Sequence, residues 1–281
     1  MFIIRSLISQ IISIKKLQLT VSNMDFTLNR YRELLSELLR AGYKIMPYNA
    51  FLKNDIDGKK VIMRHDVDSK EHALDMAKIE LEMGVRASYY FRAVPESWDE
   101  HLIRDIAAMG HEIGFHYESL TTSNGDVDKA YEDFCHNLEA LRQLASVETI
   151  CMHGSPRSKY DSKDIWKKFD YHILGIIGEP YFDTDFSKVF YLTDTGRRWD
   201  GYKVSVRDKV EGQQKIWKAK GLVFRHTKDI IEAFGDNRLP DQIMFTVHPP
   251  RWNDSIIAWT KQLVLQNIKN EIKRLIIIIR K

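Results

Sequence analysis

Short apolar runs alternate with segments of helical spacing along most of the chain. Runs typical of buried strands lie at residues 61–65, 86–94, 111–117, 149–153, 171–177, 189–192, 221–226 and 242–248. Between them, apolar residues recur at helical spacing, as in the long segment at 127–145. Asp68 with Glu71, and Ser97 with Glu100, form two capping-box patterns that predict helix starts. This repeated strand-then-helix order predicts an α/β fold, a distorted and nearly closed (β/α) barrel of about seven parallel strands. A doubly wound open sheet is the alternative.

A single domain is expected over residues 24–281, ending in a basic C-terminal helix. Residues 1–23 hold an apolar stretch that Arg5 and Ser6 interrupt, whereas a membrane span needs about 20 mostly apolar residues. We expect this extension not to be part of the native protein, with translation beginning at Met24. The alternative is an amphipathic segment on a membrane surface. The other end, KNEIKRLIIIIRK at 269–281, has the basic residues needed for weak contact with anionic lipid headgroups.

Composition and charge exclude several classes of protein. Hydrophobic residues make up 44% of the 281 and charged residues 29%, which rules out wholesale disorder. The formal net charge of +3 is too small to indicate a nucleic-acid partner. The two cysteines form no CxxC pair and no disulfide framework, so a cytoplasmic protein is expected. The GxGxxG, GxxxxGK[ST] and GxSxG motifs are absent, which argues against dinucleotide binding, a P-loop and an α/β-hydrolase elbow.

Ionisable side chains follow several of the predicted strands. Asp66 and Asp68 come directly after the strand at 61–65, and three later strands end at His116, His153 and His248. In barrels and open α/β sheets, reactive residues lie at the carboxyl ends of the strands, which meet at one edge. We therefore expect these five side chains to converge.

Their chemistry favours a metal site. Arg64, Asp66 and Asp68 share one face if the chain stays extended, and two carboxylates in one site resist ionising together unless a cation lies near them. One Asp with two His is a usual ligand set for a catalytic zinc-like ion. Such an ion makes hydroxide available near neutral pH, a second carboxylate takes a proton from the water, and a histidine protonates the leaving group. The pattern predicts metal-assisted hydrolysis of an amide or an ester.

Three of these segments resemble motifs of the polysaccharide deacetylase family, the NodB-homology domain of carbohydrate esterase family four. They are RHDVD at 64–68, GHEIGFH at 110–116 and TVH at 246–248, and the resemblance covers roughly residues 60–250. It implies that Asp66 is the catalytic base, Asp68 and His116 are metal ligands, and His248 is the general acid.

The chain also resembles a subgroup of this family that is associated with bacterial O-antigen and capsule biosynthesis. This resemblance depends on the segments MHGSP, IGEPYFD, LTDTGRRWDG and TVHPPRW. The DTGRRWDG segment at 194–201 resembles the family's Asp/Trp segment, which implies that Asp194 and Trp199 shape the substrate pocket. Tyr117 is a further candidate for stacking on a sugar ring. The family's third motif supplies an arginine that orients the base, and Arg64 or Arg157 is expected to do so here.

One departure from the family leaves the third metal ligand open. The second motif usually has another histidine four residues after the first, and here that position is Leu120. His153, on the next strand, is the preferred replacement. Glu118 is an alternative ligand or a partner of one, and His111 is a weaker substitute. The remaining alternative is a degraded metal site.

The resemblance implies a metal-dependent deacylase that removes an N-acetyl or similar group from an amino sugar during surface-polysaccharide assembly. The expected cofactor is a divalent metal, with zinc preferred. The amino-sugar substrate is nucleotide-linked, lipid-linked or polymeric, nucleic acid is not a partner, and the termini make weak peripheral contact with a membrane. The protein is expected in the cytoplasm, with the inner face of the membrane as a further location. Two alternatives are a catalytically inactive carbohydrate-binding or scaffold protein of the same fold and a hydrolase of non-sugar amides.

Overall fold

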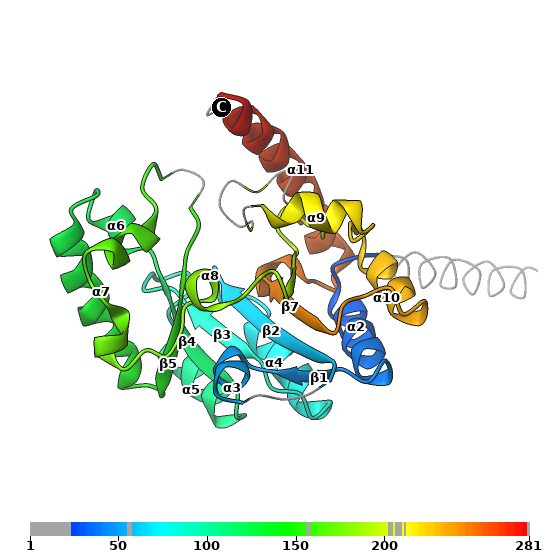
Figure 1. Cartoon of the computed structure of the whole chain (residues 1–281), viewed down its shortest axis with the longest axis horizontal. Coiled ribbons are helices and arrows are strands. Elements are labelled where there is room, and N and C mark those ends of the chain that lie inside the picture. The colour runs from blue at the N-terminus through cyan, green and yellow to red at the C-terminus, as the bar shows by residue number, and fades with distance from the viewer. Residues whose placement is uncertain are drawn as a thin grey trace, which may run out of the picture.

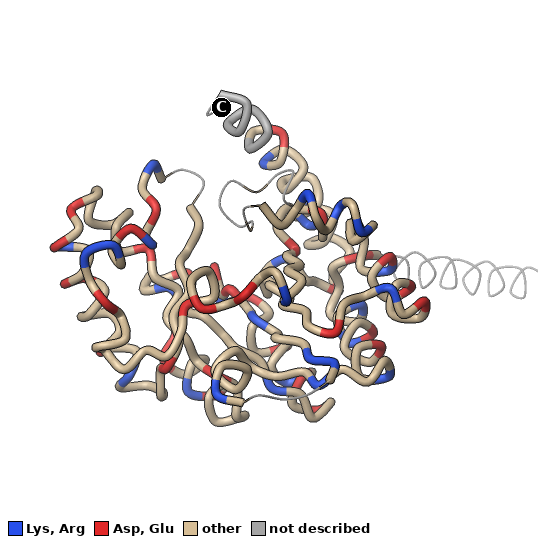
Figure 2. Tube along the Cα trace, in the orientation of Figure 1, with Lys and Arg blue, Asp and Glu red and all other residues tan. Residues whose placement is uncertain are grey.

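A computed structural model describes residues 24–54, 58–155, 158–201, 205, 210 and 212–279, with side chains as far as 272 in the last helix. The predictions for residues 1–23, for Arg157 and for the basic side chains at 273–281 fall outside these described residues. Figure 1 shows the chain, and Figure 2 shows that basic and acidic positions are interspersed over it. In the described part, no helix is long and apolar enough to cross a lipid bilayer.

The centre of the molecule is a parallel seven-stranded sheet. Its strands are β1 (Lys44–Met46), β2 (Lys60–Val67), β3 (Ser88–Phe91), β4 (Glu112–Tyr117), β5 (Val147–Met152), β6 (Phe190–Thr193) and β7 (Gln242–Val247). The order is β5-β4-β3-β2-β7-β6, with β1 paired to the first part of β2. The predicted α/β fold with a distorted barrel of parallel strands is thus confirmed. Within the described residues, no strand pairing joins β5 to β6, so the barrel stays open there.

Helices connect and cover the strands (Figure 1). They are α2 (Leu28–Arg40), α3 (Tyr48–Lys53), α4 (Ala73–Glu82), α5 (Glu100–Ala108), α6 (Ser119–Thr122), α7 (Val127–Arg142), α8 (Pro180–Asp183), α9 (Gln213–Ala219), α10 (Thr227–Gly235) and α11 (Ile256–Ile279). Three 3₁₀ helices are η1 (Ser162–Lys167), η2 (Tyr171–Leu174) and η4 (Pro249–Arg251). In α2, Tyr31, Leu34 and Leu38 are fully buried, and Thr27 caps the helix by accepting from the Arg30 N–H.

Both predicted capping boxes are wrong. Helix α4 starts only at Ala73, after His72 at a positive φ of 61°, so Asp68 is free of a capping role. Helix α5 is capped by Asp99, whose carboxylate accepts from the Leu102 N–H, rather than by Ser97. The Ser97 hydroxyl instead donates to the Val67 carbonyl at 2.6 Å and holds the end of β2.

Two predicted strands are also wrong. In the segment 171–177, the first four residues form the 3₁₀ helix η2, which Asp170 caps and Gly175 ends at a φ of 73°. At 221–226 the structure has no strand, because the Arg225 and His226 N–H groups donate to Asp229 at the start of α10. Strand β1 was not predicted, because its three residues are too few to show strand alternation.

Candidate active site

The predicted side chains converge at the carboxyl edge of the sheet. Strand β2 carries Asp66 and leads into Asp68, β4 carries His116, and His153 and His248 directly follow β5 and β7. Because neighbouring strands are parallel, the ends of β4 and β5 pair side by side, with His116 opposite Cys151. The structure therefore brings together the five residues that the sequence predicts to meet.

Asp68, His116 and His153 offer one ligand atom each, all within 4.8 Å of one another. The Asp68 Oδ1 lies 3.9 Å from the His116 Nε2 and 3.5 Å from the His153 Nε2. That oxygen is buried and accepts no hydrogen bond. A buried, unpartnered carboxylate oxygen is costly, so its position between two imidazole nitrogens fits a bound cation.

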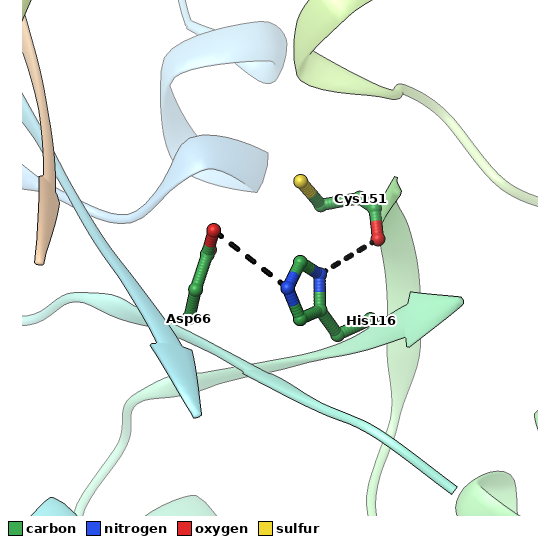
Figure 3. Close-up of side chains that lie close together, drawn as sticks. All are labelled: Asp66, His116 and Cys151. Atoms are coloured by element: carbon green, nitrogen blue, oxygen red, sulfur yellow. Dashed lines mark hydrogen bonds and ion pairs between the residues drawn. The ribbon is translucent and has the colours of Figure 1, made fainter. Parts of the chain in front are cut away.

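The second nitrogen of each imidazole has an acceptor. The His116 Nδ1 donates to the Cys151 carbonyl at 2.9 Å (Figure 3), and the His153 Nδ1 donates to the Glu118 carboxylate at 2.9 Å. In a neutral imidazole the proton then stays on Nδ1, and the Nε2 lone pair faces Asp68. Such acceptors are the usual partners of histidines that bind metal.

The charge states of these side chains also suit a metal site. Burial lowers the pKa of His116 to about 4, so the ring is neutral near pH 7, as a ligand must be. Burial raises the pKa of Asp68, but the charges of His248 and His153 outweigh burial and hold that pKa below its usual value. Glu118 is ionised as well: burial raises its pKa, but the hydrogen bond from His153 and the Arg92 charge hold the pKa at about 2. One carboxylate and two imidazoles form the ligand set of a catalytic zinc-like site.

Asp66 is fixed by an arginine on its own strand. The Arg64 guanidinium donates to both carboxylate oxygens, at 2.9 and 2.8 Å. Burial raises the pKa of Asp66, but the Arg64 charge outweighs burial and brings that pKa well below the usual range. The Asp66 Oδ2 lies 3.7 Å from the His116 Nε2 and 4.0 Å from the His248 Nε2. With Cys151, Asp66 and His116 form a second possible ligand group, but both Asp66 oxygens already pair with Arg64.

His248 has a carboxylate partner on its other side. Its Nδ1 donates to the Asp194 Oδ1 at 2.6 Å, and its backbone N–H donates to the Asp194 Oδ2 at 3.0 Å. The Arg251 guanidinium and the Trp252 indole N–H also donate to Asp194. Burial and the Arg251 charge lower the pKa of His248, but Asp194, helped by Asp68, raises it above the usual histidine value. Protonation of His248 is therefore more favourable than protonation of a free histidine.

The residues expected to contact substrate are buried. Tyr117 is fully buried, packs on Phe134 and accepts a hydrogen bond from the Trp166 indole N–H. Trp199 is 3% exposed and donates to the Thr227 hydroxyl. These two side chains are core residues in this structure, and burial leaves neither a free ring face for a sugar. Asp194 is also fully buried, and its partners make it an orienting group for His248.

Two other positions considered for the third ligand, Leu120 and His111, contribute no ligand atom to the site. Leu120 is 3% exposed in the core, and His111 lies at the start of β4, where its ring contacts the Ala77 carbonyl. Glu118 is the partner of His153. Arg92 and Arg251, which hold Glu118 and Asp194, were not predicted as site residues. Arg92 falls inside the strand predicted at 86–94, although β3 ends at Phe91, and Arg251 had no assigned role within TVHPPRW.

No protein-family model matches the sequence, and no curated protein matches it significantly. Solved structures with some similarity include a family 4 carbohydrate esterase from Bacillus anthracis, with 12% identity, a TM-score of 0.40 and coverage of 84% of each chain. PdaA of Bacillus subtilis, a family 4 carbohydrate esterase, has the same identity, TM-score and coverage. The catalytic domain of a peptidoglycan N-acetylglucosamine deacetylase from Eubacterium rectale has 9% identity and a TM-score of 0.41 over 77% of this chain and 87% of that one. At these TM-scores, the similarity carries no weight for function.

Proposed function

We propose that the protein is a metal-dependent deacylase that removes an N-acetyl or similar acyl group from an amino sugar. The observation that carries this proposal is the unpartnered Asp68 oxygen facing two oriented imidazoles, beside an arginine-held Asp66 and a carboxylate-held His248. The motif resemblance supports the sugar substrate and a role in bacterial O-antigen or capsule biosynthesis in the cytoplasm. The amino sugar is nucleotide-linked, lipid-linked or polymeric, and the protein makes weak peripheral contact with a membrane.

In this proposal, Asp68, His116 and His153 hold a divalent cation, with zinc preferred. When bound, such an ion polarises the acyl carbonyl and lowers the pKa of water. Asp66 takes the proton of the attacking water, and Arg64 keeps its carboxylate ionised and fixed in direction. His248 gives its Nε2 proton to the departing amine, while Asp194 keeps the Nδ1 proton in place.

The pairing of a fixed base with a protonated histidine is what amide hydrolysis requires. An amine is a poor leaving group unless it is protonated, and the raised pKa of His248 favours the proton donor. The lowered pKa of Asp66 keeps its carboxylate ionised, which is the form that can accept a proton. The Asp66 Oδ2 and the His248 Nε2 are 4.0 Å apart, so both groups can reach one reacting centre.

The experiment measures zinc content and acetate release by the full chain with a panel of N-acetylated amino sugars and non-sugar amides. We expect about one zinc-like ion per chain and acetate release from sugars. Asp66→Asn should keep the metal and lose turnover, whereas Asp68→Asn should lose both. Metal binding with cleavage of non-sugar amides alone would contradict the substrate class, and turnover without metal would contradict the mechanism.

The inactive carbohydrate-binding protein is the alternative, because Leu120 replaces an expected ligand. In the structure, His153 presents its Nε2 to Asp68 from the neighbouring strand. A complete ligand set with Arg64-held Asp66 beside it favours the enzyme. An inactive protein would bind sugar equally well with Asp66→Asn and show no acetate release at any metal loading.

A further inference from the structure

One side of α11 exposes large apolar side chains. They are Ile257 (84% exposed), Val264 (54%), Leu265 (46%), Ile268 (55%) and Ile272 (51%). At 3.6 residues per turn, these positions fall within an arc of about 100°. Figure 1 shows α11 running outward from the body of the molecule. The exposed Lys261 lies in the same arc, between Ile257 and Val264. Scattered exposed apolar residues need no explanation, but the four that follow within less than three turns of a projecting helix form an apolar stripe that indicates a partner.

The opposite side of α11 is fixed to the body. The Trp259 indole N–H donates to the Asp25 carbonyl at 2.6 Å, and the buried Asn270 amide donates to the Gly196 carbonyl at 3.0 Å. The Gln262 amide donates to the Pro250 carbonyl. These bonds set the rotation of the helix about its axis, so the apolar stripe faces away from the sheet.

The net positive charge of the C-terminal segment indicates which kind of partner the apolar stripe binds. From residue 256 to the end of the chain, six basic residues stand against the single acidic Glu271: Lys261, Lys269, Lys273, Arg274, Arg280 and Lys281. Pairing with a second copy of this helix would bring like charges together. An anionic lipid surface accepts both the basic residues and the apolar stripe, and each basic residue near it contributes about 1 kcal/mol.

The same contacts join α11 to the active-site edge. Gly196 comes two residues after Asp194, and Pro250 comes two residues after His248. The Arg197 guanidinium also donates to the Trp259 carbonyl at 3.1 Å. The helix therefore rests on the two loops that carry the proposed proton donor and its partner.

We infer that α11 is an interfacial helix that binds an anionic lipid surface and holds the active-site edge next to it. Resting on the proposed function, this placement favours a lipid-linked amino sugar over a soluble one.

The test is co-sedimentation of the full chain with phosphatidylcholine vesicles, with and without phosphatidylserine. The parent should bind the anionic vesicles and lose binding as salt is raised. Ile268→Glu places a charge in the stripe and should weaken binding by about tenfold or more, since it removes one large apolar side chain from the lipid. Asn267→Glu adds the same charge on an exposed position outside the stripe and should weaken binding much less. Circular dichroism melting should show both variants folded.

Equal binding by the two variants, or no binding of the parent to anionic vesicles, would overturn the inference. A parent that is dimeric in solution, becomes monomeric with Ile268→Glu and ignores vesicles would assign the stripe to a subunit interface instead. The two proposals fail separately, because vesicle binding needs no turnover. Acetate release without vesicle binding would support the proposed deacylase activity and contradict the proposal that α11 binds a membrane.

Discussion

Glu118→Gln tests whether the partner of His153 sets its metal-binding nitrogen. Glu118 uses one oxygen to accept from Arg92, at 2.6 and 3.0 Å, and the other to accept from the His153 Nδ1 at 2.9 Å. A glutamine has one acceptor and one donor group. Because Arg92 can only donate, the amide oxygen will face Arg92 and the NH₂ will face His153. The imidazole must then carry its proton on Nε2, the nitrogen that faces Asp68.

The expected effect is a 10- to 100-fold weaker zinc affinity, or about 1.4–2.7 kcal/mol, as is usual when the partner of a ligating histidine is lost. Competition titration against a chromophoric zinc chelator measures it directly. Glu132→Gln is the matched control, because Glu132 is an exposed residue of α7 and the same charge is removed. Thermal unfolding of the metal-free proteins shows whether the fold is retained.

His153→Ala should bind zinc hardly at all. If it does, but Glu118→Gln binds zinc within twofold of the parent, the tautomer reasoning is refuted and His153 is still a ligand. Unchanged affinity in both variants would remove His153 from the ligand set. The next candidate for a metal site would then be the group formed by Cys151, Asp66 and His116.

Three further predictions concern the buried charges. Asp194→Asn should lower the turnover rate by roughly 10²- to 10⁴-fold. Because Asp194 raises the pKa of His248, the alkaline limb of the pH–rate profile should also move to lower pH. A limb that does not move would contradict this role of Asp194. Arg64→Met leaves Asp66 buried without its cation and should destabilise the fold by about 3–5 kcal/mol in denaturant titrations near neutral pH, so an unchanged midpoint would count against the pair. Burial raises the pKa of Glu179 from 4.5 to about 7. The folded state therefore holds this proton more tightly than the unfolded chain, and stability is lost as pH rises from about 4.5 to about 7, by about 3 kcal/mol. Glu179→Gln should flatten that slope, and parallel slopes in the two proteins would show that Glu179 is not its source.

The converging strand ends could be predicted because they depend on local sequence. A buried parallel strand reads as an apolar run, and ionisable residues at or just after the end of the run mark its carboxyl end. This rule located Asp66, His116 and His248 without any knowledge of pairing. The alternation of side chains along β2 also placed Arg64 beside Asp66, which the bidentate contact bears out.

Contacts between distant segments could not be predicted in the same way. The sequence indicated Glu118 as a ligand or the partner of one, but not that it contacts His153, 35 residues away. Likewise, it did not indicate that Asp194 contacts His248, 54 residues away. Tyr117 and Trp199 looked available for a sugar because aromatic residues near a site have no sequence feature that separates stacking from core packing. The segment at 171–177 failed for a related reason, since a short apolar run fits a strand or a buried 3₁₀ turn equally well.

The two aspartates of the RHDVD segment show how one short sequence makes two different groups. A backbone hydrogen bond from the Asp68 N–H to the Asp66 carbonyl, at 2.9 Å, turns the chain at the end of β2. Asp66 stays on the strand face with Arg64, which satisfies both of its oxygens, so its charge is neutralised without a metal. Asp68 is carried past the strand, where its Oδ1 meets only the Nε2 atoms of two histidines. Because His116 is neutral near pH 7 and the Asp68 Oδ1 accepts no hydrogen bond, the proposed metal site depends on Asp68 rather than on both aspartates.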